Sequence, residues 1–359
     1  MGKFIDINGR YIGTEYPIYI IAELSANHNH DYDLAVKMIE AAKQAGANAV
    51  KLQTYTADIL TIQSDKEYFR VGGGTLWEGR TLYDLYQEAY MPWEWQRKLK
   101  AVAADLGIDL FSTPFDESAV DFLEDIAVPA YKVASFEIVD IGLLEKIAQT
   151  GKPVIMSTGM ATLAEIEEAM NTLRKNGANQ IALLKCTSGY PALPEEMNLI
   201  TIPHLADAFQ VPVGLSDHTM GTAVPVAASA LGACIIEKHF TLSRSIAGPD
   251  SAFSLEPAEF KQMVDSVRTA EKALGEINYG VSEQEKKSRV FRRSLFVVED
   301  LKAGDNFTSK NVRSIRPGHG LHTRYLGDVL ERKAIVDISS GTPLSWDCVG
   351  GVKEKPNEQ

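Results

Sequence analysis

Residues 211–240, VPVGLSDHTMGTAVPVAASALGACIIEKHF, contain the pattern that decides the fold. An apolar run at 211–215 is followed by Ser-Asp-His, and an alanine-rich helical stretch then leads to a second apolar run, 233–236, followed by Glu-Lys-His. Two buried strands joined by a helix are typical of a parallel βαβ unit. Polar groups are costly to bury unless they bind something, so this unit predicts a binding site where its strands end.

The same unit recurs along the first three-quarters of the chain. Eight apolar runs are each followed by a helical pattern, and these runs are 18–24, 49–52, 108–111, 130–134, 153–156, 180–185, 211–215 and 233–236. Polar or charged residues stand at the carboxyl end of every run. The repeat predicts an α/β fold, a (β/α)8 TIM barrel with its site at the C-terminal face of the strands, and therefore an enzyme.

The chain of 359 residues exceeds a barrel of about 250 residues and leaves room for a second, small module. We expect a catalytic barrel at 1–275 with an N-terminal hairpin around Asn8-Gly9, a linker at 276–289, a β-rich module at 290–350 and a tail at 351–359. A long insertion at 54–91 interrupts the repeat, as binding loops often do. Its glycines 72–74 favour a hinge, because no Gly-Lys-Ser/Thr follows them.

The composition excludes several classes of partner. A net charge of −12 and a pI near 5.2 argue against binding to nucleic acid or to anionic membranes. No apolar run approaches the ~20 residues that cross a bilayer. Cys186, Cys234 and Cys348 form neither a disulfide framework nor a CxxC motif, and we expect packed thiols at the first two. A cytoplasmic protein is therefore expected.

Lys51 and Lys132 each lie within an otherwise apolar stretch, on the second and fourth predicted strands. One alternative is that each lysine pairs with a buried carboxylate. Two lysines together with several hydroxyls favour an anion pocket, in which ammonium and hydroxyl groups hold a phosphate and a carboxylate. The hydroxyls at the neighbouring strand ends are those of Thr113, Ser135, Ser157 and Ser216.

His218 and His239 stand at the ends of the seventh and eighth strands, which are neighbours in a barrel. A single histidine there is more often a hydrogen-bonding residue, but two on adjacent strands favour a shared divalent ion. An ion with only two imidazole ligands keeps open positions, as catalytic sites do. Asp217 and Glu237 are expected to support the site or to be structural.

Glu23 and Glu137 are the candidate acid–base groups. Glu23 ends the first strand, and Glu137 lies just past the fourth strand, where the alternative is a carboxylate at a helix start. A glutamate at a buried strand end near two lysines is expected to stay ionised, which suits a base or a residue that positions water.

Several motifs resemble the sialic acid synthase family over nearly the whole chain. They are ELSANHN at 23–29, KLQT at 51–54, STPF at 112–115, YKVAS at 131–135, STGM at 157–160, GLSDH at 214–218 and EKHF at 237–240. Residues 294–349, with IRPG at 315–318, resemble its antifreeze-like (SAF) domain. The SANHN version of the first motif and the insertion GGTLWEGRTLYDLY at 73–86 are similar to the pseudaminic acid synthase branch. Ser188 stands where neuraminate synthases have asparagine.

The resemblance implies a transferase that condenses phosphoenolpyruvate with an open-chain acetamido sugar, here 2,4-diacetamido-2,4,6-trideoxy-L-altrose, and releases phosphate by C–O cleavage. It implies that phosphoenolpyruvate is held by Lys51, Thr113, Lys132, Ser135, Ser157, Ser188 and Ser216. Gln53, Glu137, Tyr190 and Asp250 would orient the sugar, and Glu23 would position the attacking water. His218 and His239 would bind Mn²⁺, with Mg²⁺ or Co²⁺ as alternatives.

The resemblance further implies a domain-swapped homodimer, in which Arg316 reaches the sugar of the partner subunit. N-acetylneuraminate or legionaminate synthesis by the same chemistry is the nearest alternative function. Remoter alternatives are an aldolase or lyase with a Schiff-base lysine, Lys132 or Lys185, and a non-catalytic sugar-binding protein.

Overall fold

The computed structural model describes residues 4–74, 76–330 and 332–351. The chain divides into two compact units, Met1–Gly275 and Glu276–Gln359. Residues 352–359, nearly all of the expected tail, lie outside the described residues, as do residues 1–3 at the start of the expected barrel domain.

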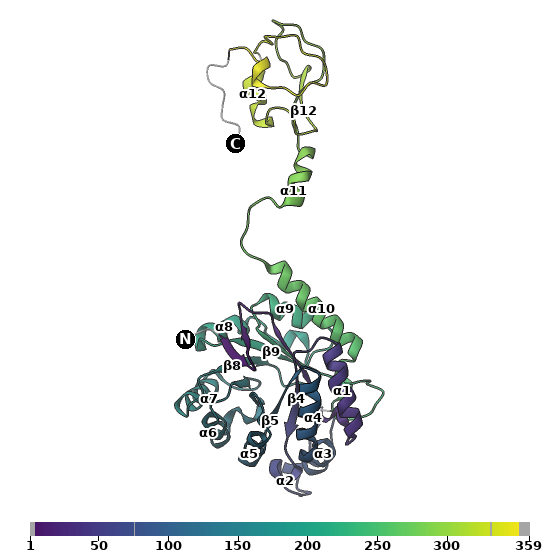
Figure 1. Cartoon of the computed structure of the whole chain (residues 1–359), viewed down its shortest axis with the longest axis vertical. Helices are drawn as coiled ribbons and strands as arrows, with labels where there is room; N and C mark the ends of the chain where they lie inside the picture. Colours follow the sequence, from purple (N-terminus) through teal and green to yellow (C-terminus); the bar gives the residue numbers. More distant parts are fainter. Residues whose placement is uncertain (1–3, 75, 331, 352–359) are drawn as a thin grey trace. The chain divides into compact units, whose positions relative to one another are not determined.

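The first unit is a closed barrel of eight parallel strands, which confirms the predicted TIM barrel (Figure 1). The strands follow one another around the barrel in chain order, and the last pairs with the first. They are β3 (Tyr19–Glu23), β4 (Ala49–Thr54), β5 (Asp109–Pro114), β6 (Tyr131–Val133), β7 (Val154–Ser157), β8 (Ile181–Cys186), β9 (Val213–Asp217) and β10 (Ile235–His239). Several strands, among them β10, extend past the apolar run into the polar residues, so these residues are held by the barrel's hydrogen bonds.

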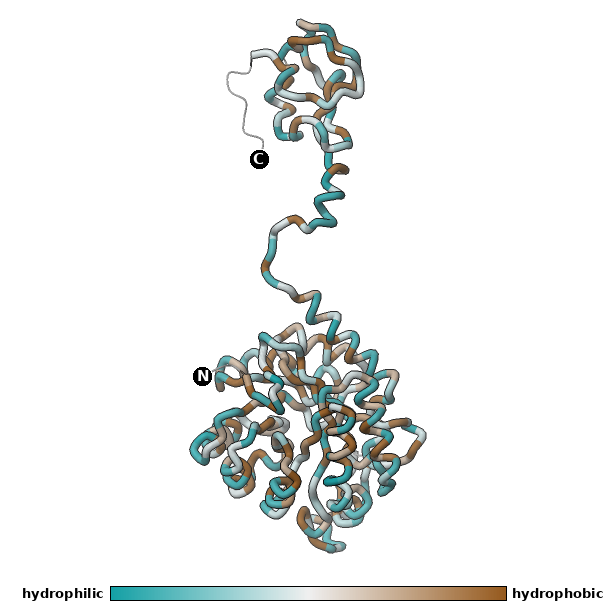
Figure 2. The backbone as a smooth tube through the Cα atoms, viewed as in Figure 1, coloured by the Kyte–Doolittle hydropathy of each residue, from teal (hydrophilic) through white to brown (hydrophobic). Residues whose placement is uncertain are grey.

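Helices surround the barrel (Figure 1). They are α1 (Tyr32–Gln44), α4 (Trp93–Asp105), α5 (Glu117–Asp125), α6 (Ile141–Gln149), α7 (Leu163–Lys175), α8 (Thr201–Phe209), α9 (Ala223–Ala230) and α10 (Pro257–Leu274). Hydrophobic and hydrophilic residues alternate along α10, as expected of a helix with one buried face (Figure 2). Thr162 and Glu165 form a capping box at the start of α7, where each side chain binds the other's backbone N–H.

The hairpin β1 (Phe4–Ile7) and β2 (Arg10–Gly13) packs on the N-terminal end of the barrel. Asn8 and Gly9 have φ of +53° and +77°, the left-handed conformation that a type I′ turn needs. Asn8 Nδ2 donates to Asp109 Oδ1 over 2.8 Å at the start of β5. The hairpin thus covers the end of the barrel opposite to the predicted site.

The insertion at 54–91 contains α2 (Ala57–Leu60) and α3 (Leu82–Ala89), with a bridge between Arg70 and Thr81. The 3₁₀ helices are η1 (Ser25–His28), η2 (Glu67–Phe69), η3 (Phe136–Val139), η4 (Pro194–Glu196), η5 (Ser251–Phe253), η6 (Arg289–Phe291), η7 (Thr323–Tyr325) and η8 (Trp346–Cys348). None of the helices in the described part of the chain is long and apolar enough to cross a membrane.

The second unit is a small β module. It contains α11 (Glu283–Ser288), an antiparallel pair of strands, β11 (Ser294–Val297) and β12 (Val312–Ile315), and α12 (Leu326–Val329). Buried side chains that include Leu295, Phe307 and Trp346 form its own core. The short helix α11 lies within the segment that the sequence indicated as a linker.

A buried ion pair joins the ends of β9 and β10. Lys238 Nζ lies 2.6 Å from Asp217 Oδ2, and neither side chain is exposed to solvent. Lys238 also donates to the carbonyl of Thr219, and Asp217 Oδ1 accepts from the backbone N–H and hydroxyl of Thr219. Because these residues stand next to His218 and His239, the pair fixes the backbone from which both histidines project.

We predict that Lys238→Met lowers the free energy of unfolding by about 3–5 kcal/mol, because it leaves the Asp217 carboxylate buried and unpaired. Lys261→Met is the control, since Lys261 and Asp265 form an exposed pair one helical turn apart and contribute about 0.3–0.5 kcal/mol. Urea denaturation of both variants measures the difference. Equal losses in the two would contradict the importance of the buried pair.

Candidate active site

Lys51 stands at the centre of a buried ionic cluster at the carboxyl ends of β3, β4, β5 and β10. Its Nζ lies 3.1 Å from Glu23 Oε2, 3.2 Å from Glu237 Oε1 and 3.4 Å from Thr113 Oγ1. Ser216 on β9 donates to Glu237 Oε1 over 3.3 Å. Burial raises the pKa of Glu23 although Lys51 opposes it, whereas Lys132 and Lys51 hold the pKa of Glu237 low against the effect of burial. Of the two interpretations of the buried lysines, pairing with buried carboxylates therefore holds for Lys51.

Lys132 differs from Lys51 in its partners. Its Nζ donates to Ser157 Oγ over 2.6 Å and to the carbonyl of Val133 over 2.8 Å, and both acceptors are uncharged. The side chain is fully buried, and burial lowers its pKa to about 8, although Glu237 opposes the shift. A buried ammonium without a direct ion pair favours a bound anion beside it.

Two hydroxyls and a glycine converge at the ends of β6, β7 and β8. Ser135 Oγ accepts from the backbone N–H of Gly159 over 3.1 Å. A Cβ atom at Gly159 would lie 2.4 Å from Ser188 Oγ and 2.7 Å from Ser135 Oγ, so only glycine fits there. The structure thus brings Ser135 and Ser188 together around the buried backbone N–H of Gly159, an arrangement of donors that can hold anionic oxygens.

His218 and His239 are neighbours, with ring centroids 5.3 Å apart. His218 Nδ1 lies 2.9 Å from the carbonyl of Thr187, which leaves Nε2 as the acceptor nitrogen. His239 Nδ1 is buried without a hydrogen-bond partner. Burial and the neighbouring His218 hold the pKa of His239 well below its usual range, so its imidazole is neutral at pH 7.

The donor set fits a divalent ion with open positions, because two imidazole rings lie side by side at neighbouring strand ends. The Cys186 thiol and the Thr187 carbonyl raise the pKa of His218 against the effect of burial. No group of three or more His, Cys, Asp and Glu side chains that could hold a metal occurs among residues 4–74, 76–330 and 332–351. Any remaining ligands would therefore be water or substrate oxygens. Cys186 Sγ lies 3.9 Å from His218 Nδ1, which places this thiol within the site although the sequence indicated only a packed residue.

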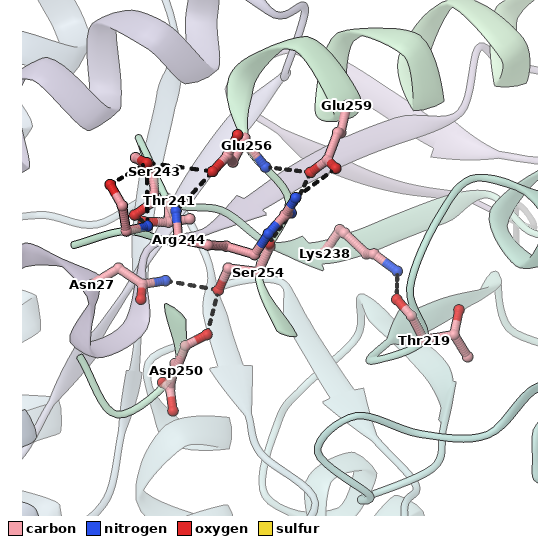
Figure 3. Close-up of polar contacts among 11 residues, drawn as sticks. Asn27, Thr219, Lys238, Thr241, Ser243, Arg244, Asp250, Ser254, Glu256 and Glu259 are labelled. Carbon is pink, nitrogen blue, oxygen red and sulfur yellow. Dashed lines mark hydrogen bonds and ion pairs between the residues drawn. The ribbon is translucent and has the colours of Figure 1, made fainter. Parts of the chain in front are cut away.

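A chain of hydrogen bonds leads from the ionic cluster to the loop between β10 and α10. Gln53 Nε2 donates to Glu23 Oε1 over 2.8 Å and to Ser25 Oγ over 2.9 Å, and Ser25 donates to Asp250. Ser254 Oγ donates to the carbonyl of Asp250 over 2.6 Å and accepts from Asn27 (Figure 3). Gln53 and Asp250 are therefore fixed polar groups at one side of the site.

An aromatic cluster covers the histidines. The Tyr190 ring centroid lies 4.4 Å from that of His218 and 6.3 Å from that of His239, and Phe253 lies 5.0 Å from His239. The sequence predicted Tyr190 but missed Phe253, Ser25 and the central position of Glu237. Alternation along β10 is the signal for Glu237, because side chains two residues apart face the same side and His239 was already a candidate.

Glu137 lies in η3, outside the direct contacts described above. Glu137 Oε2 is buried without a hydrogen-bond partner, and burial raises the pKa of this carboxyl to about 7 against the effect of Lys132. Arg316 belongs to the second unit and follows β12.

Comparison with known proteins identifies both units. Residues 38–279 match the NeuB family model, and residues 292–350 match the SAF domain model. The chain is 47% identical to pseudaminic acid synthase from Campylobacter jejuni, over 92% of this chain and 96% of the relative. It is 44% identical to pseudaminic acid synthase from Helicobacter pylori, over 92% of this chain and 97% of the relative.

A solved structure is similar as well. It is the N-acetylneuraminic acid (sialic acid) synthetase from Leptospira borgpetersenii in complex with citrate, with 33% sequence identity and a TM-score of 0.71. The similarity covers 80% of this chain and 95% of that chain. These matches confirm the resemblance that the strand-end motifs indicated.

The raised pKa of Glu137 predicts a pH-dependent stability. The pKa of its carboxyl is ordinarily 4.5 and is about 7 in the folded protein. The free energy of unfolding therefore falls as pH rises from the first value to the second. Glu137→Gln cannot ionise and escapes this loss. Thermal melts should show the variant gaining Tm relative to the wild type as pH rises from 4.5 to about 7. A constant Tm difference would contradict the assignment.

Proposed function

The chain belongs to the NeuB family, and from this membership we propose that it is a pseudaminic acid synthase. In this reaction the enol carbon of phosphoenolpyruvate attacks the aldehyde of 2,4-diacetamido-2,4,6-trideoxy-L-altrose. Water adds to C2, and phosphate leaves with the bridging oxygen. The enzyme is then a transferase that forms a C–C bond. Its three free cysteines favour the cytoplasm.

The single observation that carries this proposal is the pairing of two different binding regions at one barrel end. Lys132, the hydroxyls of Ser135, Ser157 and Ser188, and the N–H of Gly159 form a region for an anion. The histidine pair and its aromatic cover form a second region across β8, β9 and β10. A condensation of an anionic enol with a sugar aldehyde needs these two regions side by side.

In the proposed mechanism, Lys132 and Lys51 hold phosphoenolpyruvate together with Thr113, Ser135, Ser157, Ser188 and Ser216. Lys132, whose ammonium has only uncharged acceptors, balances part of the anion's charge, and the whole set orients the enol carbon towards the second region. Gln53, Glu137, Tyr190 and Asp250 orient the sugar, and the charge of Lys132 acts on the Glu137 carboxyl against the raised pKa that burial gives it. Glu23, fixed between Gln53 and Lys51, positions the water that adds to C2 and accepts its proton.

His218 and His239 would hold the divalent ion, for which Mn²⁺ is proposed with Mg²⁺ and Co²⁺ as alternatives. When bound there, such an ion supplies Lewis-acid polarisation of the sugar aldehyde. The neutral imidazole of His239 and the Thr187 carbonyl that orients His218 both suit this role.

Phosphate release tests the proposed function. We expect phosphate release from phosphoenolpyruvate to require a sugar, with a higher kcat/KM for the diacetamido sugar than for N-acetylmannosamine, because discrimination should come mainly from the 4-acetamido group and the ring stereochemistry. Equal or better kcat/KM with N-acetylmannosamine would indicate a neuraminate synthase, as the similar Leptospira structure is named. Preference for a stereoisomeric diacetamido sugar would indicate a legionaminate synthase.

A Schiff-base aldolase is the remoter alternative, since a lysine with a lowered pKa such as Lys132 suits that chemistry. Borohydride with substrate would then form a stable adduct on Lys132 or on Lys185. We expect no adduct, because the chemistry proposed here needs no imine. Sugar-dependent phosphate release would also exclude a non-catalytic sugar-binding protein.

Metal removal should abolish turnover. Two imidazoles make a weak site, so a chelator should strip the ion, and Mn²⁺ or Co²⁺ should restore activity. His218→Ala and His239→Ala should remain folded, bind Mn²⁺ more weakly by calorimetry and lose activity. Full turnover by the chelated enzyme would show that these histidines serve another purpose.

We also propose a homodimer in which Arg316 contacts the sugar bound by the partner subunit. Residues 1–275 contain 22 Lys and Arg against 36 Asp and Glu, a net charge of −14, whereas residues 276–359 contain 14 against 12, a net charge of +2. Opposite charges favour association of the second unit of one copy with the first unit of another.

Complementation tests this arrangement. His218→Ala and Arg316→Ala proteins, each inactive, should regain part of the activity after subunit exchange, because a mixed dimer holds one site built from intact parts of both chains. Proven heterodimers without activity would mean that Arg316 acts within its own chain or not at all.

A further inference from the structure

The insertion at 54–91 presents one large aromatic side chain, Trp77, to the site. The turn that carries it is closed by backbone hydrogen bonds, from Val71 N to Arg80 O over 2.9 Å and from Gly79 N to Val71 O over 3.0 Å. Arg80 forms an ion pair with Glu88 of α3 over 2.6 Å. The turn is therefore a defined platform for its half-buried indole.

Trp77 spans from this turn to the loop between β10 and α10. Its Nε1 donates to the carbonyl of Pro249 over 3.0 Å, next to Asp250. That loop is itself well fixed, because the Arg244 guanidinium binds both carboxylate oxygens of Glu259 (Figure 3). The backbone N–H of Arg244 also donates to Glu256 over 2.8 Å. The indole is thus held at a set position relative to Asp250.

The other side of the indole continues the aromatic cluster. The Trp77 ring centroid lies 5.9 Å from that of Tyr190, which in turn lies 4.4 Å from His218 and 5.2 Å from Phe253. The rings form a continuous apolar wall that begins at the histidine pair and ends at Trp77. Lys132, Ser135 and Ser157, which carry much of the anion region, come from β6 and β7, whereas the rings follow β4, β8, β9 and β10, so we assign this wall to the sugar side.

Resting on the proposed function, we propose that Trp77 binds the end of the sugar that is distal to the aldehyde. A sugar whose aldehyde lies at His218 and His239 extends along the wall, and its deoxygenated C6 end meets the indole. Aromatic faces favour C–H groups over hydroxyls, which suits a trideoxy sugar. Trp77 is then a specificity residue that contributes to sugar affinity and does not touch the reacting atoms.

Three variants separate the ring from its hydrogen bond and from general effects on stability. Trp77→Ala removes both, and Trp77→Phe keeps an aromatic face but loses the bond to Pro249. Trp93→Ala is the matched control, because Trp93 is also half-buried, donates to the carbonyl of Tyr55 over 3.1 Å and packs on Phe122 outside the site. Thermal melts establish that each variant is folded.

We expect Trp77→Ala to raise the KM for the 6-deoxy sugar about tenfold, a typical loss for one apolar contact, with kcat and the KM for phosphoenolpyruvate nearly unchanged. The loss should be smaller with the 6-hydroxy counterpart, so that the preference for the deoxy sugar falls. Trp77→Phe should lie between Trp77→Ala and the wild type, and Trp93→Ala should match the wild type.

Sugar binding without turnover is measured by quenching of tryptophan fluorescence, which Trp77→Phe should largely abolish. Unchanged sugar KM and affinity in Trp77→Ala, while the wild type turns over, would overturn this inference alone. Wild-type protein that binds the sugar and quenches through Trp77, yet releases no phosphate, would support the Trp77 contact and overturn the proposed function. Wild-type protein that neither binds nor turns over the sugar would overturn both.

Discussion

The position of Lys51 between the carboxylates of Glu23 and Glu237 is the interaction on which the rest of the active site depends. A carboxylate or ammonium buried alone is strongly unfavourable, so these three ionisable groups are tolerated only while the barrel holds them together. The register of the barrel does this, since β3 pairs with both β4 and β10 and places Glu23 opposite Lys51 on one side and His239 on the other. Closing the barrel therefore also brings a histidine to the ionic cluster.

The ionic cluster also divides the site into two regions. Because two carboxylates already surround Lys51, the unpaired positive charge lies at Lys132, across the barrel from the histidines and among the hydroxyls of β6, β7 and β8. The other side is neutral and aromatic, and the loops after β4, β8 and β10 complete it with Trp77, Tyr190 and Phe253. The carboxyl ends of the strands thus offer one region suited to an anion and another suited to a sugar. A condensation of two such substrates requires both regions.

Much of this arrangement could be predicted from the sequence because the side chains in question follow a period-2 pattern on short strands. Lys51, Lys132, Ser157, Ser216, His218 and His239 all occur at strand ends, and a closed parallel barrel brings strand ends together. The sequence could not show that Lys51 is already paired, because Glu237 was one of several carboxylates and only the register selects it. The position of Trp77 could not be predicted from the sequence either, because its contact with Pro249 joins two irregular loops that are 172 residues apart.

The central claim is that this barrel end joins an enol to an aldehyde and releases phosphate by cleavage of the C–O bond. The most direct measurement uses phosphoenolpyruvate labelled with ¹⁸O at the bridging oxygen, incubated with the diacetamido sugar and Mn²⁺, with mass spectrometry of the phosphate and of the nine-carbon product. We predict that the label appears in phosphate and that the C2 oxygen of the product comes from water. Label retained in the sugar acid would mean attack at phosphorus, and it would contradict the roles assigned to Glu23 and to the anion region.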